Sequence, residues 1–439
     1  MKVVMVLAIA ALATAVARAQ TPAGPGDITL LEAEALLLRK NRDIALARRA
    51  IDQVRADTLI AGQAPNPQLS WLTQNINRGR GVGAGGLQDK TVDTIVALSQ
   101  TIERGGKAGL RVAAARSLET AAGAELGDTV RTRVLALRSA YYDLLALQEK
   151  TDSATETARL FERSVAAAAM RERAGDRAGA DVARLRVEAA RARNDAGTAA
   201  AELSRARLAL AALVAIDEKA AALRAVSPWP ELAEPQSPLE DQVSGRPDVR
   251  AAVARMQAAD RLRDLARSLR TRDVTVSAQF EHYPATDANP GGSGNSIGIG
   301  VSVPLFLRHA YEGEAARAQA DWYAARDALE RTMAAARTEI ARSRGDVAAA
   351  SERRSRIEGE LLPQARRGAE AAEFAFRNGA SGVMDLLDAR RTLKAIQIEA
   401  SVTRADHAKA LAALRAAVEP LPMEFENESL KEESMERTP

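Results

Sequence analysis

The sequence predicts a mainly α-helical protein with a small membrane β part, arranged as a two-fold internal repeat. Four segments of about ten residues alternate apolar and polar side chains, a pattern typical of tilted membrane strands. Long stretches without proline place apolar residues three and four positions apart, as in packed helices. The order of these elements in the first half of the chain returns in the second half, which indicates a duplicated unit.

Residues 1–19 are expected to be a secretory signal peptide. Lys2 supplies the positive charge at the start, an apolar stretch follows, and Ala17 and Ala19 form a small-x-small cleavage pattern. The mature chain is then expected to begin near Gln20. The alternative is a membrane anchor, which the shortness of the apolar stretch and the cleavage pattern disfavour.

The composition excludes several classes of function. Lys and Arg total 61 and Asp and Glu total 58, a balance that disfavours a nucleic-acid-binding protein. There is no cysteine, so the chain offers neither a thiolate metal site nor a cysteine for a lipid anchor. Beyond the signal segment no apolar run reaches about 18 residues, so the exported chain is expected to be soluble or a membrane β-barrel. The acidic tail, residues 421–439, is expected to be disordered.

The alternating segments form two expected β-hairpins, at residues 67–102 and 273–304. Each hairpin is joined by a glycine-rich connection, and one face of each strand is apolar while the other carries serine, threonine, glutamine or glycine. Two exposed hairpins on a soluble protein remain the alternative. In a membrane, open sheet edges are not tolerated, and four strands are too few to enclose a lumen. Several copies would therefore have to combine their strands.

The first repeat is expected at residues 20–226 and the second at residues 239–420, separated by a proline-rich linker at residues 227–238. Each repeat contains a short helix, a hairpin, a very long helix, a turn and an ascending helix. The first long helix has no proline between residues 103 and 173, which corresponds to roughly 105 Å at 1.5 Å per residue. A repeat of this kind indicates units that cannot bury their apolar faces alone.

Two aspartates, Asp385 and Asp388, follow a turn sequence at residues 378–382. Their spacing is close to one helical turn, so both carboxylates should share a helix face near a helix start. The residues alone leave open a catalytic pair, a metal site, a solvated helix start that complements the helix dipole, and the narrow mouth of a passage, with the helix start favoured. A glycosidase-like pair is disfavoured because the region has almost no aromatic residues.

Several strings in the sequence point to one family. They are the duplicated layout itself and the segments "GRPDVRAA", "VSVPLFLRHAYEGEAARA" and "NGASGVMDLLDAR". Over residues 30–418 the chain resembles the TolC-like outer-membrane efflux channel family of Gram-negative bacteria. The segments "APNPQLSW" and "LSQTIERGGKAGLRVAAA" are most similar to its cobalt–zinc–cadmium cation-efflux branch.

This resemblance implies a homotrimer in the outer membrane, extending into the periplasm. Each protomer would give four strands to a twelve-stranded β-barrel that is continuous with a long α-helical coiled-coil tunnel. The protein would be a passive exit duct, not an enzyme, and would need no cofactor. It would work with a periplasmic adaptor protein and an inner-membrane pump of the resistance–nodulation–division (RND) type, with heavy-metal cations as the expected cargo. A multidrug or type I secretion duct of the same family and a soluble periplasmic coiled-coil adaptor or scaffold are the alternatives.

The resemblance also implies that Asp385 and Asp388 line the periplasmic aperture, where three copies would gather six carboxylates that attract cations. In the first repeat, Asp181 stands at the position equivalent to Asp385, and Arg184 at that of Asp388. Five arginines near the helix ends could bridge neighbouring helices and hold the aperture shut, although for any single one a solvated face is favoured: Arg171, Arg173, Arg177, Arg184 and Arg377. The turns expected to contact the adaptor contain Gly175, Gly179, Gly379 and Gly382. No metal site is expected, because the three histidines are scattered through the sequence.

Overall fold

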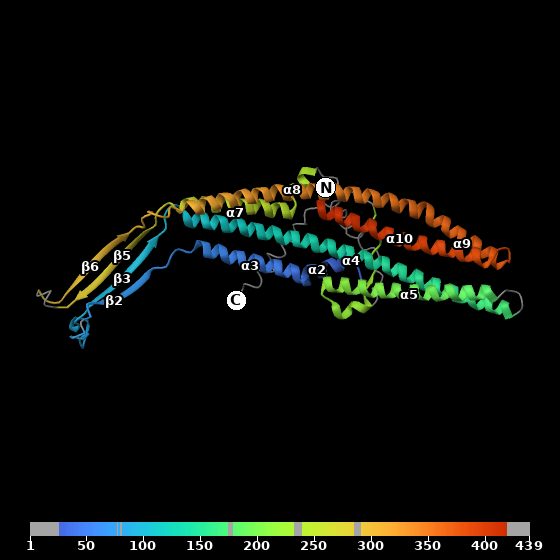
Figure 1. The fold of residues 1–439 in the computed structure, drawn as a ribbon, viewed down its shortest axis with the longest axis horizontal. Coiled ribbons are helices and arrows are strands. Elements are labelled where there is room, and N and C mark those ends of the chain that lie inside the picture. The colour runs from blue at the N-terminus through green and yellow to red at the C-terminus, as the bar shows by residue number, and fades with distance from the viewer. Residues whose placement is uncertain are drawn as a thin grey trace, which may run out of the picture. The chain divides into compact units, whose positions relative to one another are not determined.

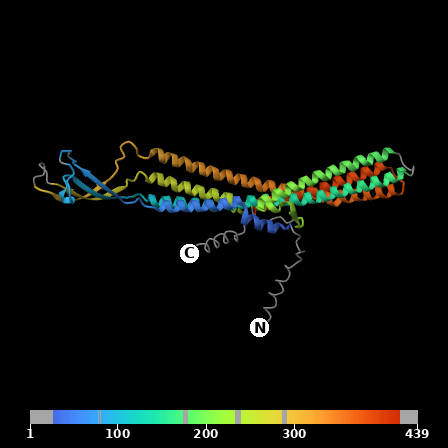
Figure 2. The same ribbon diagram turned by 90° about the horizontal axis from the view of Figure 1, so that it is seen from below.

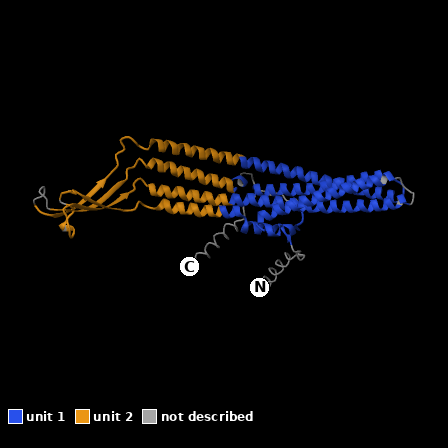
Figure 3. Ribbon diagram, turned by 60° about the horizontal axis from the view of Figure 1, so that its bottom comes forward, with its two compact units in different colours: residues 1–46, 127–246, 335–439 blue, residues 47–126, 247–334 orange. Residues whose placement is uncertain are grey.

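The structure of the protein is a computed structural model that describes residues 26–76, 78–79, 81–173, 179–231, 239–284 and 291–418. The expected signal peptide, the expected disordered tail and most of the proline-rich linker lie outside these residues. The chain divides into two compact units (Figure 3). Unit 1 comprises residues 1–46, 127–246 and 335–439, and unit 2 comprises residues 47–126 and 247–334.

The described chain is mostly helical with few strands, which confirms the mainly α class (Figure 1). The principal helices are α2 (Leu30–Lys40), α3 (Arg42–Gly62), α4 (Lys107–Arg173), α5 (Gly179–Val214), α7 (Pro247–Ser268), α8 (Glu312–Arg356), α9 (Leu362–Arg377) and α10 (Val383–Val418). Shorter elements are β1 (Asp27–Ile28), η1 (Leu87–Asp89), η2 (Asp217–Ala222), β4 (Arg224–Ala225) and α6 (Leu239–Ser244). On α4, Leu137, Tyr141 and Leu144 are completely buried at spacings of four and three, as expected for a helix-packing seam.

The second long helix departs from a continuous α-helix. Between α8 and α9 the chain forms a π-helical turn, η3 (Ile357–Leu361), and Pro363 lies in the first turn of α9. Proline has no N–H group to donate to the preceding turn, so the regular helical hydrogen bonding is interrupted at this point. The proline in the sequence marks the position, but the widening of the turn was not predicted.

Unit 2 contains a four-stranded antiparallel sheet in the order β2-β3-β5-β6. The strands are β2 (Gln68–Gln74), β3 (Asp93–Ile102), β5 (Val274–Tyr283) and β6 (Gly294–Ser302). The central pair, β3 and β5, joins strands from the two halves of the chain. Among the described residues, no strand pairs with the outer edge of β2 or of β6.

The register of the sheet gathers apolar side chains on one face. One row across the four strands consists of Trp71, Val96, Phe280 and Ile297, and the next consists of Leu69, Leu98, Ala278 and Ile299. Ile297 and Ile299 are 81% and 83% exposed. The opposite face is mostly serine, threonine, glutamine and glycine. The register thus confirms the alternation expected for β3, β5 and β6, and it leaves a broad apolar face uncovered within the described chain.

The connection from β3 to α4 is fixed by glycine and by a buried lysine. Gly105 and Gly106 have φ angles of +76° and +70°, and a Cβ on Gly105 would lie only 2.9 Å from the Cβ of Thr271. The Lys107 ammonium lies 2.8 Å from Asp273 Oδ1 and donates to the Thr271 carbonyl at 2.9 Å, and its side chain is only 6% exposed. These contacts hold the start of α4 against the connection between α7 and β5.

We expect Lys107→Met to lower the midpoint of thermal unfolding, because the Asp273 carboxylate would lose its charged partner. The loss corresponds to about 1–3 kcal/mol. The measurement is a melting curve by far-UV circular dichroism in detergent. Lys219→Met, at an exposed position in η2, is the matched control and should melt like the wild type. Equal midpoints for both variants would show that the pair does not stabilise the connection.

In unit 1, the hydroxyl of Tyr141 ties the N-terminal segment to the start of the linker. It donates to the Ile28 carbonyl at 2.9 Å and accepts from the N–H groups of Val226 and Ser227 at 3.1 and 2.9 Å. Nearby, β1 pairs in parallel with β4. Within the described part of the chain, no helix has the length and apolar character needed to cross a membrane.

Candidate functional site at the helix ends

The turn between α9 and α10 is built by residues that end one helix and begin the next. These helices lie side by side in both views (Figures 1 and 2). Gly379 has a φ of +74°, and the following Ala380 N–H donates to the Ala375 carbonyl at 2.8 Å, which closes the end of α9. The Gly382 N–H donates to Asp385 Oδ2 at 3.2 Å, so Asp385 caps the start of α10.

The spacing of Asp385 and Asp388 places both carboxylates on the outward face of α10. Both residues are exposed, whereas Leu386 and Leu387 between them are buried. Leu387 belongs to an apolar cluster that includes Leu185 on α5. Asp385 thus has the capping role that a solvated helix start would give it. Asp388 has an arginine, Arg391, one helical turn further along α10.

Three basic side chains of α10 reach α4 and α5 immediately after these aspartates. Arg391 forms two bonds with Glu188 of α5, with Nη2 2.5 Å from Oε1 and Nε 3.2 Å from Oε2. Arg390 Nη1 donates to Ser164 Oγ of α4 at 3.0 Å. Lys394 Nζ lies 2.5 Å from Asp195 Oδ2 of α5. We call these residues and their partners the α10 latch.

The ion pair between Arg391 and Glu188 joins a guanidinium side chain that is 47% exposed to a largely enclosed carboxylate. The Glu188 side chain is only 11% exposed and also accepts from Arg191 Nη1 at 3.1 Å. The hydrogen bond from Arg391 to Glu188 raises the pKa of the Arg391 guanidinium. A bidentate guanidinium–carboxylate pair of this kind fixes the direction of α10 relative to α5.

The other residues expected at the helix ends have varied surroundings. Arg377 pairs with Glu373 on its own helix, and Glu373 Oε2 is also 3.5 Å from Arg390 Nη2. Arg184 is exposed on α5, and Arg173 is exposed at the end of α4.

Two positions, Gly175 and Arg177, lie outside the described residues. Three more are placed only by their element: Arg171 is in the last turn of α4, Gly179 begins α5, and Asp181 is in the first turn of α5.

The residues of the α10 latch were not predicted from the sequence. A signal was present, because Arg390, Arg391 and Lys394 continue the segment that contains the two aspartates. The spacing shows that basic groups follow the acids within two helical turns. It does not show that their partners lie on α4 and α5, about 200 positions earlier.

A model of the outer membrane efflux protein family matches residues 35–215 and 239–418. The chain belongs to this family. Its two matched ranges are separated by a gap that contains the proline-rich linker, and each contains one hairpin of the sheet. The protein is therefore an outer membrane efflux channel, a transport duct without enzymatic activity.

Similar proteins support this placement of the channel. The cobalt-zinc-cadmium resistance protein CzcC of Cupriavidus metallidurans is 28% identical over 380 residues, covering 84% of each chain. Among solved structures, the CmeC outer membrane channel of Campylobacter jejuni superposes with a TM-score of 0.76 at 17% identity, covering 92% of this chain and 89% of that one. The outer membrane protein VceC of Vibrio cholerae gives 0.71 at 20% identity, covering 88% and 95%. These structures share the fold of the efflux channel.

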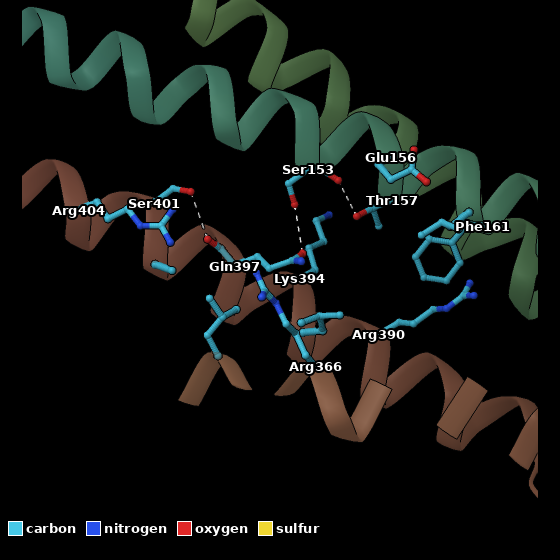
Figure 4. A pocket seen from close by; sticks show the side chains of 14 residues that line it. Ser153, Glu156, Thr157, Phe161, Arg366, Arg390, Lys394, Gln397, Ser401 and Arg404 are labelled. Carbon is cyan, nitrogen blue, oxygen red and sulfur yellow. Dashed lines mark hydrogen bonds between the residues drawn. The ribbon is translucent and has the colours of Figure 1, made fainter. Parts of the chain in front are cut away.

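A cavity of about 280 Å³ lies beside the latch of the channel, between α4 and the helices α9 and α10 (Figure 4). Ser153 on α4 donates across it to Gln397 on α10 at 3.3 Å. The cationic residues Arg404 and Lys394 that line it already pair with carboxylates. The cavity therefore marks a place where α10 and α4 are not closely packed, and its lining combines these polar groups with apolar side chains such as Leu160, Phe161 and Leu393.

A second polar cluster of the channel surrounds the π-turn in unit 1. Arg404 Nη1 lies 3.1 Å from Glu149 Oε2, and Arg404 Nε also bonds to Glu358. Arg354 Nε donates to Glu358 Oε2 at 3.0 Å, and its Nη1 lies 3.2 Å from His407 Nδ1. His407 is completely buried, and its Nε2 has no hydrogen-bond partner in the described residues. Burial and the adjacent Arg354 lower the pKa of His407, so the ring is neutral at neutral pH.

We expect the channel to become less stable in acid partly through His407. Its folded-state pKa lies below the ordinary value of 6.5, so the unfolded chain binds more protons between the two values. The stability that the neutral His407 ring contributes is fully present above pH 6.5 and is lost as the pH falls through the folded-state pKa. The melting midpoint of His407→Gln should fall less than that of the wild type over this interval. His309→Gln, at a side chain that is 63% exposed, should follow the wild type. Identical pH profiles for all three proteins would contradict this assignment.

Within the described part of the chain, no three His, Asp or Glu side chains converge in an arrangement that could hold a metal ion. Histidines 282, 309 and 407 contact Asn295, Glu314 and Arg354, respectively. The candidate site of the channel consists of a pair of exposed carboxylates beside the α10 latch.

Proposed function

We propose that three copies of the chain form an outer-membrane exit duct, in which their sheets close a twelve-stranded barrel and their helices form a periplasmic tunnel. The observation that carries this proposal is the sheet of unit 2. It has an exposed apolar face, a polar opposite face and two edges, at β2 and β6, that have no partner strand among the residues the structure describes. Unpaired strand edges cannot face lipid, and closure with neighbouring copies removes them. The polar face then lines a water-filled passage.

The assembly is tested by extracting outer membranes with detergent and measuring the mass of the intact complex. The expected mass is three times that of the mature chain. A monomer that is folded in buffer without lipid or detergent would refute the barrel and support the soluble scaffold alternative. Cell fractionation gives an independent result, because a periplasmic scaffold would appear in the soluble fraction.

The energy for export would come from an RND-type inner-membrane pump joined to the duct by a periplasmic adaptor. The turns that contain Gly179, Gly379 and Gly382 would contact the adaptor. Family membership supports this arrangement, because a duct without enzymatic activity needs another protein to supply the energy for export. Gly379 is suited to a contact surface because its positive φ keeps the turn compact and open space surrounds it.

Heavy-metal cations are the proposed cargo. The name of the similar protein CzcC refers to cobalt, zinc and cadmium resistance, and the exposed carboxylates of Asp385 and Asp388 would present a cation-attracting rim in three copies. A deletion strain should become sensitive to these metals and regain resistance when the gene is restored. Sensitivity to drugs with unchanged metal tolerance would favour the multidrug alternative.

We expect the double variant Asp385→Ala and Asp388→Ala to lose cation preference in planar-bilayer recordings. Removing six carboxylates from three copies takes away the local negative potential, so both cation selectivity and block by divalent cations should fall by roughly tenfold. The matched control replaces Asp217 and Glu218, two exposed carboxylates of η2, with alanine. Unchanged selectivity in the aperture variant, with normal conductance, would place the selective rim elsewhere.

A further inference from the structure

We infer that the base of the sheet in unit 2 is a binding belt for anionic phospholipid headgroups. The inference rests on the proposed membrane insertion of the sheet. The belt consists of four exposed arginines and an apolar segment that continues from the end of β6. Its arginines are Arg104, Arg270, Arg272 and Arg308.

The apolar part of the belt begins where β6 ends. Past Ser302 the chain contains Val303, Leu305 and Leu307, and the two leucines are 69% and 85% exposed. The Leu307 N–H donates to the Leu305 carbonyl at 3.0 Å, which turns the segment tightly at this point. These side chains extend the uncovered apolar character of β6 beyond the last paired residue of the strand. Side chains with this exposure fit the acyl region just below lipid headgroups.

The four arginines are brought together by contacts at the same connections. The Arg104 N–H donates to Asp273 Oδ1 at 2.9 Å, beside Arg272. Lys107 donates to the Thr271 carbonyl, which lies between Arg270 and Arg272 in the sequence. The Arg272 guanidinium lies 5.4 Å from the ring centre of Phe306, two positions before Arg308.

The acidic groups at this base are mostly already neutralised. Glu103 forms two bonds of 2.7 Å with Arg111, and Asp273 pairs with Lys107. Glu314 Oε1 lies 2.8 Å from His309 Nε2, a contact that offsets the carboxylate charge only when the imidazole is protonated. Glu312, in the first turn of α8, is the acidic residue with no such partner in the described chain.

By contrast, the guanidinium groups of the four belt arginines have no carboxylate partner among the described residues. Four unpaired guanidinium groups beside exposed leucines present positive charge directly above an apolar surface. That is the arrangement that phosphate headgroups over acyl chains complement, because arginine can bind phosphate oxygens in pairs while its stem lies along lipid. The ligand that fits this surface is an anionic phospholipid of the leaflet on the helix side of the sheet.

The test uses the purified trimer in nanodiscs that contain phosphatidylglycerol and phosphatidylcholine. Native mass spectrometry then identifies the lipids that stay bound to the protein after it is released from the nanodisc. The test variant replaces all four belt arginines with glutamine. The control variant makes the same change in charge at exposed arginines of unit 1, Arg159, Arg163, Arg366 and Arg367. We expect the wild type and the control to retain phosphatidylglycerol preferentially, and the belt variant to lose this preference by at least about tenfold at low salt.

Equal lipid selectivity in the wild type and the belt variant would overturn the inference, as would a wild type without selectivity. A photoreactive amino acid at Leu307 gives a second test, where crosslinks to lipid support the belt and crosslinks to a second copy overturn it. Single-channel conductance separates this inference from the proposed function. A belt variant with normal conductance that has lost the preference for phosphatidylglycerol keeps the channel intact and lacks only the belt, whereas a wild type that neither inserts nor conducts contradicts the channel itself.

Discussion

Tyr141→Phe is expected to lower the melting midpoint of the protein by about 5 °C. The hydroxyl is buried and serves three backbone groups, the carbonyl of Ile28 and the N–H groups of Val226 and Ser227. Without it, three hydrogen bonds are lost, and of the three groups the Val226 N–H and the Ile28 carbonyl keep their mutual bond of 3.2 Å. Each lost hydrogen bond contributes about 0.5–1.5 kcal/mol, so the expected total for three bonds is about 3 kcal/mol. Because phenylalanine keeps the ring, the apolar packing of the α4 seam is preserved.

The measurement is thermal unfolding of the detergent-solubilised protein, followed by far-UV circular dichroism. Tyr323→Phe, at a residue that is 48% exposed on α8, removes the same atom without affecting a buried network. Its midpoint should stay within about 1 °C of the wild type. A Tyr141→Phe variant that melts with this control would mean that the segment around Val226 is held by other contacts.

Glu188→Gln is expected to increase the frequency of open-channel events in planar bilayers by at least about tenfold. The substitution removes the charged partner of Arg391 while keeping the size of the side chain, so α10 loses its two-bond connection to α5. A charge-assisted pair of this geometry contributes about 1.5–3 kcal/mol, and one tenfold change in an equilibrium corresponds to about 1.4 kcal/mol. Three copies acting in one aperture would enlarge the effect.

Glu162→Gln is the matched control for the latch. Glu162 Oε1 lies 3.5 Å from Arg193 Nε and also connects α4 with α5, but its side chain is 52% exposed. Exposed ion pairs contribute little, so this variant should conduct like the wild type. Similar open frequencies for Glu188→Gln and the wild type would show that the latch does not hold the aperture closed.

The sequence was most informative where structure depends on local periodicity. Alternation located β3, β5 and β6, and the seam around Tyr141 followed from three- and four-residue spacing. The outward placement of Asp385 and Asp388 likewise follows from helical geometry. In each case the decisive information lies within a dozen residues.

Features that depend on distant partners could not be predicted in this way. The bond between Arg391 and Glu188 requires the relative rotation of two helices from different repeats, which no local pattern specifies. Tyr141 looked like one more apolar seam position, because nothing nearby reveals that its hydroxyl meets Val226. The π-turn after Arg356 depends on how the chain accommodates Pro363 while keeping Glu358 bonded to Arg354.

The pairing of β3 with β5 has a consequence for biogenesis. The hydroxyls of Thr101 and Thr275 lie 3.0 Å apart although 174 positions separate them in the sequence. The first hairpin therefore emerges from the export machinery long before the second hairpin does. Closing so long a loop between them slows folding. During that interval its apolar rows are an aggregation hazard in water. A newly exported chain should consequently depend on periplasmic chaperones that shield this hairpin until the second half arrives.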